Sequence, residues 1–387
     1  MEILIIAKTY NSNNSARAIQ MTRVINALIE HCNYNITLIT ESDNKTNNPN
    51  DCLKVHYIKP SVLKILNKEK ILGVRLNDIF LLRNRNFENE GFELAKKIIV
   101  DKNIQTVYTV STPFDAHAIG LKLKSEFQNI KWVTFFSDIW PLSLSPKPYG
   151  ENSFSAKVKI KMVREVIENC DGIITPSTYT LDIIKKNFCT NAKMAAIPHC
   201  LSPKNFNYEE TIGGYIVHSG LLSKERIAEP LIEAVKELSA ENNDFKGLVH
   251  IGPYHSLLKK IIDKHNCKNI FLFNNMPEGM ANRIQCLYDV GVIIEAPMKE
   301  FSPFMPSKVT DIIQLNKKLI TISPVKSFLS DFARENKGIF SCTYEKNNIK
   351  KCILDALYST ENITKKAIHH FHPSRVANLY DSFFKSI

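Results

Sequence analysis

The 387-residue sequence lacks any apolar run of about 18 residues, so it predicts no membrane-spanning helix. The apolar start, Met1–Ala7, has no basic segment and is too short for a secretion signal, so no cleavable signal is expected. None of the nine cysteines forms a C-x-x-C pair, and their number is odd. Such scattered cysteines are typical of reduced thiols and predict a cytoplasmic protein without a disulfide framework.

Short-period repeats and low-complexity tracts are also missing, which argues against a solenoid or a disordered chain. Lys and Arg number 50 against 39 Asp and Glu, a net charge of +11. This excess favours an anionic partner, such as a phosphate-bearing ligand, an anionic lipid or nucleic acid, and the alternative is a solvated basic surface. Without a helix-turn-helix or an aromatic platform, nucleic-acid binding rests on charge only, and we do not expect it.

Strand-like apolar runs alternate with helical patterns along the chain. Glu2–Ala7 predicts a buried parallel strand, Ala16–His31 has helical spacing, and Asn35–Thr40 predicts a second strand. The alternation continues, with a helix expected at Phe92–Val100, and resumes after a linker at Leu201–Gly214. The sequence therefore predicts an α/β protein with two Rossmann-like domains and mostly parallel sheets.

We expect an N-terminal, acceptor-binding domain at residues 1–205 and a C-terminal, nucleotide-sugar-binding domain at 206–372, with the last helix, 373–387, packing back on the first domain. Ligands of open parallel sheets bind at the carboxyl ends of the strands. The expected site is accordingly a central cleft that the two domains face.

A loop with two cations follows the predicted strand Tyr215–His218. Gly220 allows close approach of the backbone to a ligand, and Lys224 and Arg226 can neutralise a diphosphate. The sequence is neither a Walker loop nor G-x-G-x-x-G. The alternative is a strand–helix turn with surface cations.

A second loop precedes the helix predicted at Ser307–Gln314. It holds the carboxylate Glu300, and Ser307 is expected to cap the helix beside Lys308, so that phosphate oxygens can bind there. Asp311, one turn into the helix, can accept hydrogen bonds from two ribose hydroxyls. Alternatively, Asp311 only favours the helix dipole.

Two further polar residues, His117 and Asp138, follow predicted strands and so belong to one sheet edge. Asp138 can contact a sugar hydroxyl or receive a proton from the acceptor, and the alternative is a turn or capping residue. We expect no metal site at His369, His370 and His372, because no carboxylate or cysteine lies near them in the sequence.

Together, these segments resemble glycosyltransferase family 4, a retaining group with the GT-B fold that includes bacterial capsule and O-antigen enzymes. Ser111–Gly120 is similar to the family's SPP-x-S-x-H-x-x-G segment and Trp132–Trp140 to W-V-x-x-F-R-D-P-W. Ser219–Arg226 resembles the G-x-x-x-x-x-R diphosphate loop, and Pro306–Ile313 resembles P-S-K-L-F-E-Y-M. The resemblance covers nearly the whole chain.

By matching position, the resemblance implies that Lys224 and Arg226 stabilise the departing diphosphate and that Asp311 replaces the Glu that grips the ribose. It implies further donor contacts from Gly220, Ser307, Lys308, Glu300, Asn274, Asn275 and Met276, the last three around the base, while Asp138 lies beside the donor sugar. Family members need no metal or other cofactor, and the donor phosphate is proposed to accept the acceptor's proton.

The sequence departs from the family in the loop after the first strand. Asn11–Ser15 replaces the usual glycine-rich loop, with Arg17 following, so Asn14, Arg17 and His117 are the expected acceptor-side residues. Members of the family carry two Glu residues with seven residues between them. This pair is not intact here, because Pro303 stands eight residues before Asp311, where the first Glu is expected.

These features predict a retaining transferase that moves a sugar from a UDP-sugar to a glycan or lipid-linked acceptor in surface polysaccharide synthesis. The alternatives are a degenerate GT-B protein that binds glycan or nucleotide without turnover, and a sugar-nucleotide 2-epimerase. The basic, amphipathic stretch Val62–Arg85 is expected to face an anionic membrane on the cytoplasmic side, and the alternative is an ordinary core-facing helix.

Overall fold

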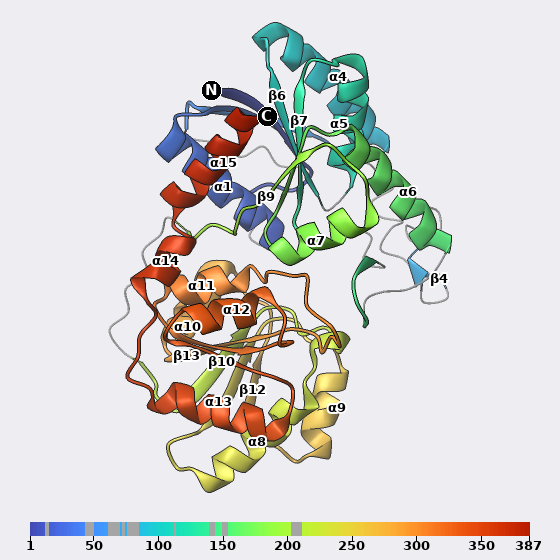
Figure 1. Ribbon diagram of the computed structural model, residues 1–387. Helices are drawn as coiled ribbons and strands as arrows, with labels where there is room; N and C mark the ends of the chain where they lie inside the picture. Colours follow the sequence, from blue (N-terminus) through green and yellow to red (C-terminus); the bar gives the residue numbers. More distant parts are fainter. Residues whose placement is uncertain are drawn as a thin grey trace. The chain divides into compact units, whose positions relative to one another are not determined.

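The computed structural model describes residues 1–11, 15–42, 50–60, 70–71, 74–75, 85–111, 114–138, 144–148, 154–202 and 211–387. The chain divides into two compact units (Figure 1). Unit 1 comprises Met1–Ser145, Tyr149–Pro198 and Pro373–Ile387, and unit 2 comprises Pro146–Pro148 and His199–His372. The main division thus falls between residues 198 and 199, whereas the sequence predicts it after residue 205.

Unit 1 is built around a seven-stranded parallel sheet in the order β3-β2-β1-β6-β7-β8-β9. Its strands are β1 (Glu2–Ala7), β2 (Asn35–Glu41), β3 (Leu53–Ile58), β6 (Thr106–Ser111), β7 (Lys131–Phe136), β8 (Gly172–Thr175) and β9 (Lys193–Ala196). Its helices are α1 (Ala16–Cys32), α4 (Arg85–Lys102), α5 (Asp115–Glu126), α6 (Phe154–Asn169), α7 (Thr178–Asn187) and α15 (Pro373–Ser386).

The C-terminal helix α15 belongs to unit 1, where it packs beside α1 (Figure 1). Tyr380 and Phe384 contact the ring of Tyr108 on β6, with centroids 5.9 and 5.4 Å away. The Tyr34 hydroxyl donates a 3.0 Å hydrogen bond to Asp381. These buried contacts anchor the end of the chain on one face of the first sheet.

Unit 2 contains a six-stranded parallel sheet in the order β12-β11-β10-β13-β14-β15. Its strands are β10 (Tyr215–Ser219), β11 (Gly247–Ile251), β12 (Ile270–Phe273), β13 (Val290–Ile294), β14 (Lys318–Ile322) and β15 (Ile339–Cys342). Its helices are α8 (Glu229–Glu241), α9 (Leu257–Lys264), α10 (Glu278–Cys286), α11 (Lys308–Gln314), α12 (Phe328–Glu335), α13 (Lys346–Tyr358) and α14 (Lys365–His370), and a 3-10 turn, η2, covers Lys224–Arg226.

Alternating side chains of the second sheet bury both of its faces, as expected of parallel strands between helix layers. Ile216 faces the core formed with α8 and α13, while the next residue, Val217, packs toward α10. On the same face as α10, Leu319 of β14 packs against α11, α12 and α14. The predicted α/β architecture of two parallel-sheet units is confirmed.

The stretch Val62–Arg85 lies mostly outside the described residues. The part that is described contains the short antiparallel strands β4 (Lys70–Ile71) and β5 (Val74–Arg75), so a continuous helix through this stretch is wrong. Its contact with a membrane stays a prediction. Within the described part of the chain, no helix combines the length and apolar character needed to cross a bilayer.

Candidate functional site

The two donor motifs predicted from the sequence meet at the carboxyl edge of the second sheet. Gly220 directly follows β10 and has φ of +120°, a conformation that an L side chain rarely adopts. A Cβ placed on Gly220 would lie 3.7 Å from Cε of Lys308, so the Lys308 side chain passes close over this glycine. The loop after β10 and the start of α11 therefore form one surface.

The loop after β10 is also tied to the loop after β11. Gly220 N donates to Ile251 O at 2.9 Å, and Leu222 N donates to Pro253 O at 3.0 Å. These backbone bonds hold the segment that leads into η2, where Lys224 is exposed and Arg226 is half-buried. Among the described residues, the Arg226 guanidinium has neither an ion pair nor a hydrogen bond, so it is available to an anion.

Two stacked histidines lie beneath this loop, on neighbouring strands. His218 Nδ1 and His250 Nδ1 are 3.0 Å apart, and His250 Nε2 is 3.1 Å from the carbonyl oxygen of Gly252. Because a carbonyl only accepts, His250 carries its proton on Nε2, and His218 donates from Nδ1. Burial lowers the pKa of His250 to about 4, and burial together with His250, Arg226 and Lys308 lowers the pKa of His218, so both rings are neutral at pH 7.

Lys308 and Asp311 of the second motif form an ion pair, with 3.0 Å between Nζ and Oδ2. The Asp311 side chain is only 8% exposed, whereas Lys308 is 31% exposed. The capping role predicted for Ser307 is wrong, because its side chain makes no capping hydrogen bond and its backbone is already helical. The start of the short helix α11 therefore carries a partly exposed lysine but no side-chain cap.

Glu295 is a residue of this edge that the sequence does not predict. It directly follows β13, is 3% exposed, and accepts a 2.6 Å hydrogen bond from Ser302 Oγ through Oε1. Its Oε2 is buried and has no hydrogen-bond partner among the described residues. Burial raises the Glu295 pKa to about 7, against the opposing effects of Ser302 and Arg226.

The remaining donor-side residues are less closely placed. Glu300 is exposed in the loop after β13. Asn274 and Asn275, just after β12, are also exposed, while Met276 packs against the core beside α10. Strand order puts all four at the same sheet edge as Gly220, with β12 two strands from β10.

A second polar cluster lies at the carboxyl edge of the sheet in unit 1. Arg17 of α1 donates from Nε to Ser137 Oγ at 3.0 Å and from Nη2 to Asp138 Oδ2 at 3.2 Å. Ser137 in turn donates to the carbonyl oxygen of Ser111 at 3.2 Å. Arg17 and Asp138, which the sequence predicts as site residues from separate segments, therefore meet. Asp138 is 47% exposed, so it can contact a ligand.

His117 has no exposed surface, unlike the ligand-contacting residue that the sequence predicts. Thr109 Oγ1 accepts from Trp132 Nε1 at 2.9 Å and lies 2.8 Å from His117 Nδ1. His117 is thus part of the core, and its pKa falls to about 3, mainly through burial and then through Arg17. Asn14 lies outside the described residues.

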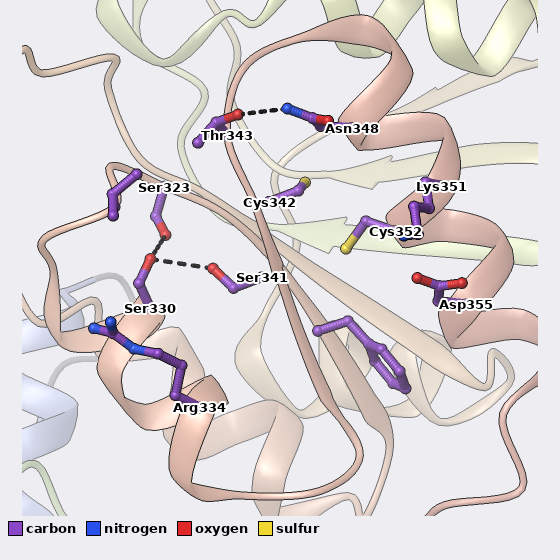
Figure 2. Close-up of a pocket in the computed structure, with 12 residues that line it drawn as sticks. Ser323, Ser330, Arg334, Ser341, Cys342, Thr343, Asn348, Lys351, Cys352 and Asp355 are labelled. Carbon is purple, nitrogen blue, oxygen red and sulfur yellow. Dashed lines mark hydrogen bonds between the residues drawn. The ribbon is translucent and has the colours of Figure 1, made fainter.

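Unit 2 also contains a pocket of about 460 Å³ beside the ends of β14 and β15. Figure 2 shows its hydroxyl network, in which Ser330 Oγ lies 3.0 Å from Ser323 Oγ and 3.1 Å from Ser341 Oγ. Arg334 and Lys351 add positive charge to its lining. None of the predicted donor residues lines this pocket.

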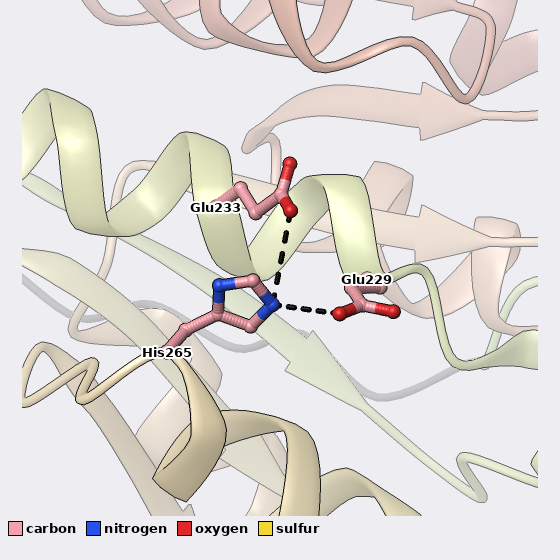
Figure 3. A group of neighbouring side chains, drawn as sticks. All are labelled: Glu229, Glu233 and His265. Carbon is pink, nitrogen blue, oxygen red and sulfur yellow. Dashed lines mark hydrogen bonds and ion pairs between the residues drawn. The ribbon is translucent and has the colours of Figure 1, made fainter.

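A group with metal-binding residue types lies between α8 and α9 (Figure 3). His265 Nε2 is 2.7 Å from Glu229 Oε1 and 3.7 Å from Glu233 Oε1. Lys264 also pairs with Glu229, at 2.8 Å, so the group already works as an ion-pair cluster that joins the two helices. The sequence predicts no metal role for His265 and does not point to the two glutamates. In the histidine run, His370 packs against Phe328 and Phe332.

No known family model matches the sequence, and no curated protein matches it. Several solved structures do resemble the whole chain. Anabaena HepE in complex with UDP and glucose is 12% identical, with full coverage of both chains and a TM-score of 0.64. A Rickettsia africae glycosyltransferase is 15% identical, covering 100% of this chain and 98% of that one, with a TM-score of 0.56.

A putative UDP-N-acetylglucosamine 2-epimerase from Listeria monocytogenes is 12% identical, covering 100% of this chain and 96% of that one, with a TM-score of 0.57. The chain has the GT-B fold. At these identities the likeness establishes the GT-B architecture and not the reaction. The chemistry must therefore be argued from the residues at the two sheet edges.

Proposed function

We propose that this GT-B protein is a retaining glycosyltransferase that uses a nucleotide-sugar donor, with a UDP-sugar as the expected substrate. The observation that carries the proposal is the close approach of Lys308 to Gly220 beside β10 and β13, with Arg226 in the loop that follows Gly220. The strand order reverses between these two strands, and ligands of open parallel sheets bind at such a switch point.

In the proposed reaction, an acceptor hydroxyl oxygen forms a bond to the anomeric carbon while the bond from that carbon to the diphosphate breaks. Negative charge then develops on the leaving diphosphate. Arg226 and Lys308 stabilise this charge, assisted by the exposed Lys224, and the hydroxyl proton passes to the leaving phosphate. Asp311 is expected to accept a hydrogen bond from a ribose hydroxyl.

Unit 1 supplies the acceptor side of the proposal. Arg17 orients the half-exposed Asp138, whose carboxylate is suited to accept hydrogen bonds from sugar hydroxyls. The cationic stretch at 62–85 fits an acceptor presented at an anionic membrane. We therefore propose a glycan or lipid-linked acceptor of the kind used in capsule or O-antigen synthesis, as in family 4.

The test is to incubate the purified chain with a panel of nucleotide sugars and acceptors and to quantify released nucleoside diphosphate and glycosylated product. Arg226→Ala should raise the barrier by about 2–4 kcal/mol because it removes charge stabilisation of the leaving group. Turnover at the wild-type rate in this variant would contradict the assignment.

Two other outcomes identify the competing functions. The likeness to the putative 2-epimerase makes epimerisation the second candidate, which NMR of the sugar nucleotide after incubation would reveal without any acceptor. UDP binding without turnover across the panel would identify a GT-B binding protein instead.

A further inference from the structure

The strand β15 is the last strand of the second sheet, so one of its edges has no neighbouring strand among the described residues. Its other edge pairs with β14, for example through the 3.0 Å bond from Ser323 N to Cys342 O. Successive residues of a strand direct their backbone N–H and C=O groups to opposite edges, so those of Ser341 point outward. No described residue makes a hydrogen bond with them. The edge of β15 therefore offers a backbone donor and a backbone acceptor to a further strand.

The pocket of about 460 Å³ lies along this open edge (Figure 2). It is lined by the consecutive residues 340–343 and by residues of α12 and α13. These two helices pack against β15 on opposite faces of the sheet. The helices are thus two walls of the pocket, and the edge of β15 lies between them. The volume falls within the roughly 300–1,000 Å³ of ordinary ligand pockets.

The wall formed by α12 is polar and carries a cation. Ser330 Oγ lies 3.1 Å from Ser341 Oγ and 3.0 Å from Ser323 Oγ, so three hydroxyl groups meet on this side of β15. Arg334, one turn further along α12, has a side chain that is 64% exposed. It pairs with Asp331, which is not one of the residues that line the pocket. An acidic side chain suits this wall, because a guanidinium donates charge-assisted hydrogen bonds to a carboxylate.

The wall formed by α13 is apolar where it meets the strand. Phe340 and Cys342 point to this side of the sheet, and both pack against the core that contains Cys352 of α13. Lys351 and Asp355, one turn apart on α13, are exposed at the rim. Their opposite charges favour neither sign. Apolar side chains therefore suit this wall, because they remove its apolar surface from water.

We propose that the edge of β15 binds an extended peptide segment in which an acidic residue stands between two apolar residues. A strand added beside β15 forms backbone hydrogen bonds with Ser341. The peptide residue opposite Ser341 lies on the same face of the sheet, so its side chain points to the α12 wall and Arg334. The residues before and after it point to the α13 wall. This peptide site goes beyond the proposed function and does not depend on it.

Fluorescence anisotropy tests the proposal with a labelled peptide, blocked at both ends, that carries Val-Glu-Val between Gly-Ser flanks. This core reads the same in both directions, so it fits either strand orientation. We expect saturable binding to the full chain and slower amide hydrogen exchange in the segment that contains β15. A Val-Lys-Val peptide should bind at least about tenfold more weakly, because its lysine faces Arg334. Absence of saturable binding by the Val-Glu-Val peptide would overturn the proposal.

A proline at the edge tests strand pairing directly. Ser341→Pro removes the outward N–H but no hydrogen bond to β14, and proline is accepted at such edge positions. It should abolish binding of the Val-Glu-Val peptide. Ser341→Ala is the matched control, because it removes the hydroxyl and keeps the N–H, and it should bind with about the affinity of the wild type. Equal affinities in the two variants would contradict pairing with β15.

Arg334→Glu tests the charge of the α12 wall, and it keeps the proposal testable if Ser341→Pro does not fold. It should reverse the preference, so that the Val-Lys-Val peptide binds more tightly than the Val-Glu-Val peptide. Arg283→Glu makes the same change at an exposed position of α10 and should keep the wild-type preference. An unchanged preference in Arg334→Glu would overturn the acidic specificity.

A second copy of the chain is the other occupant that an open edge can take. Analytical ultracentrifugation of the full chain distinguishes it from a peptide. We expect wild type and Ser341→Pro to sediment alike. A wild-type dimer that Ser341→Pro dissociates would mean that β15 pairs with a second copy, and it would overturn the peptide site.

Discussion

Lys308 Nζ lies 3.0 Å from Asp311 Oδ2, so the cation and the carboxylate of the same donor motif pair with each other across one helical turn. The buried aspartate fixes the lysine, whose stem passes over Gly220. In the proposed function, the same carboxylate accepts a hydrogen bond from a ribose hydroxyl. If the proposed function is correct, the pair links recognition of the phosphate to recognition of the ribose.

Replacing Lys308 should weaken nucleotide binding. We expect Lys308→Ala to reduce UDP affinity about 10- to 100-fold, because a charge-assisted hydrogen bond contributes roughly 1.5–3 kcal/mol. Calorimetry with UDP measures this. Lys366→Ala, which changes a lysine that is 71% exposed on α14, is the control, and equal affinities in the two variants would contradict the role of Lys308.

Gly220 should tolerate no side chain. We expect Gly220→Ala to destabilise the protein by about 1–3 kcal/mol, because φ of +120° strains an L residue. It should also weaken UDP binding, because the new methyl group contacts the Lys308 stem. Urea denaturation and calorimetry measure the two effects. Gly213→Ala is the control, since a Cβ there meets open space, and a similar loss of stability in it would contradict the explanation.

Much of the fold could be predicted because buried parallel strands are continuous apolar runs that are easily recognised in the sequence. The runs at β1 and β13, for example, are apolar throughout and each ends at a polar loop. Helix α4 begins at Arg85, earlier than the predicted Phe92, because Gly91 does not end it. A Cβ on Gly91 would lie 2.7 Å from Ile119 Cδ1, so this glycine permits close packing of α4 on α5, a tertiary effect.

The site was predicted in part, because side chains that follow parallel strands share one edge. Lys308 and Gly220 meet, as do Arg17 and Asp138. Glu295 was missed because its burial and its hydrogen bond with Ser302, seven residues further along the chain, arise only in the folded protein. The one available signal was a carboxylate directly after an apolar strand, the same signal that pointed to Asp138.

Asp138 should matter for turnover and little for stability. Its ion pair with Arg17 is half-exposed, and such pairs contribute less than about 1 kcal/mol. We expect Asp138→Asn to lower turnover at least about tenfold, because a charged hydrogen-bond acceptor for the sugar is lost. Product formation and urea denaturation measure the two quantities. Asp101→Asn, at an exposed position of α4, is the control, and unchanged turnover in Asp138→Asn would remove this residue from the site.

The protein should lose stability in mild acid through its buried histidines. Burial lowers the pKa of His117 to about 3 and that of His250 to about 4, below the 6.5 of an unfolded chain. Between these values the unfolded chain binds more protons than the folded one, so stability present above pH 6.5 is lost as the pH falls. For His117 alone, the loss at pH 5 is about 2 kcal/mol. Urea denaturation at pH 7.5 and pH 5 should therefore show a smaller pH dependence in His117→Asn than in wild type or in His31→Asn, which changes an exposed histidine. An equal dependence in all three proteins would mean that His117 is charged, or exposed, in the folded state.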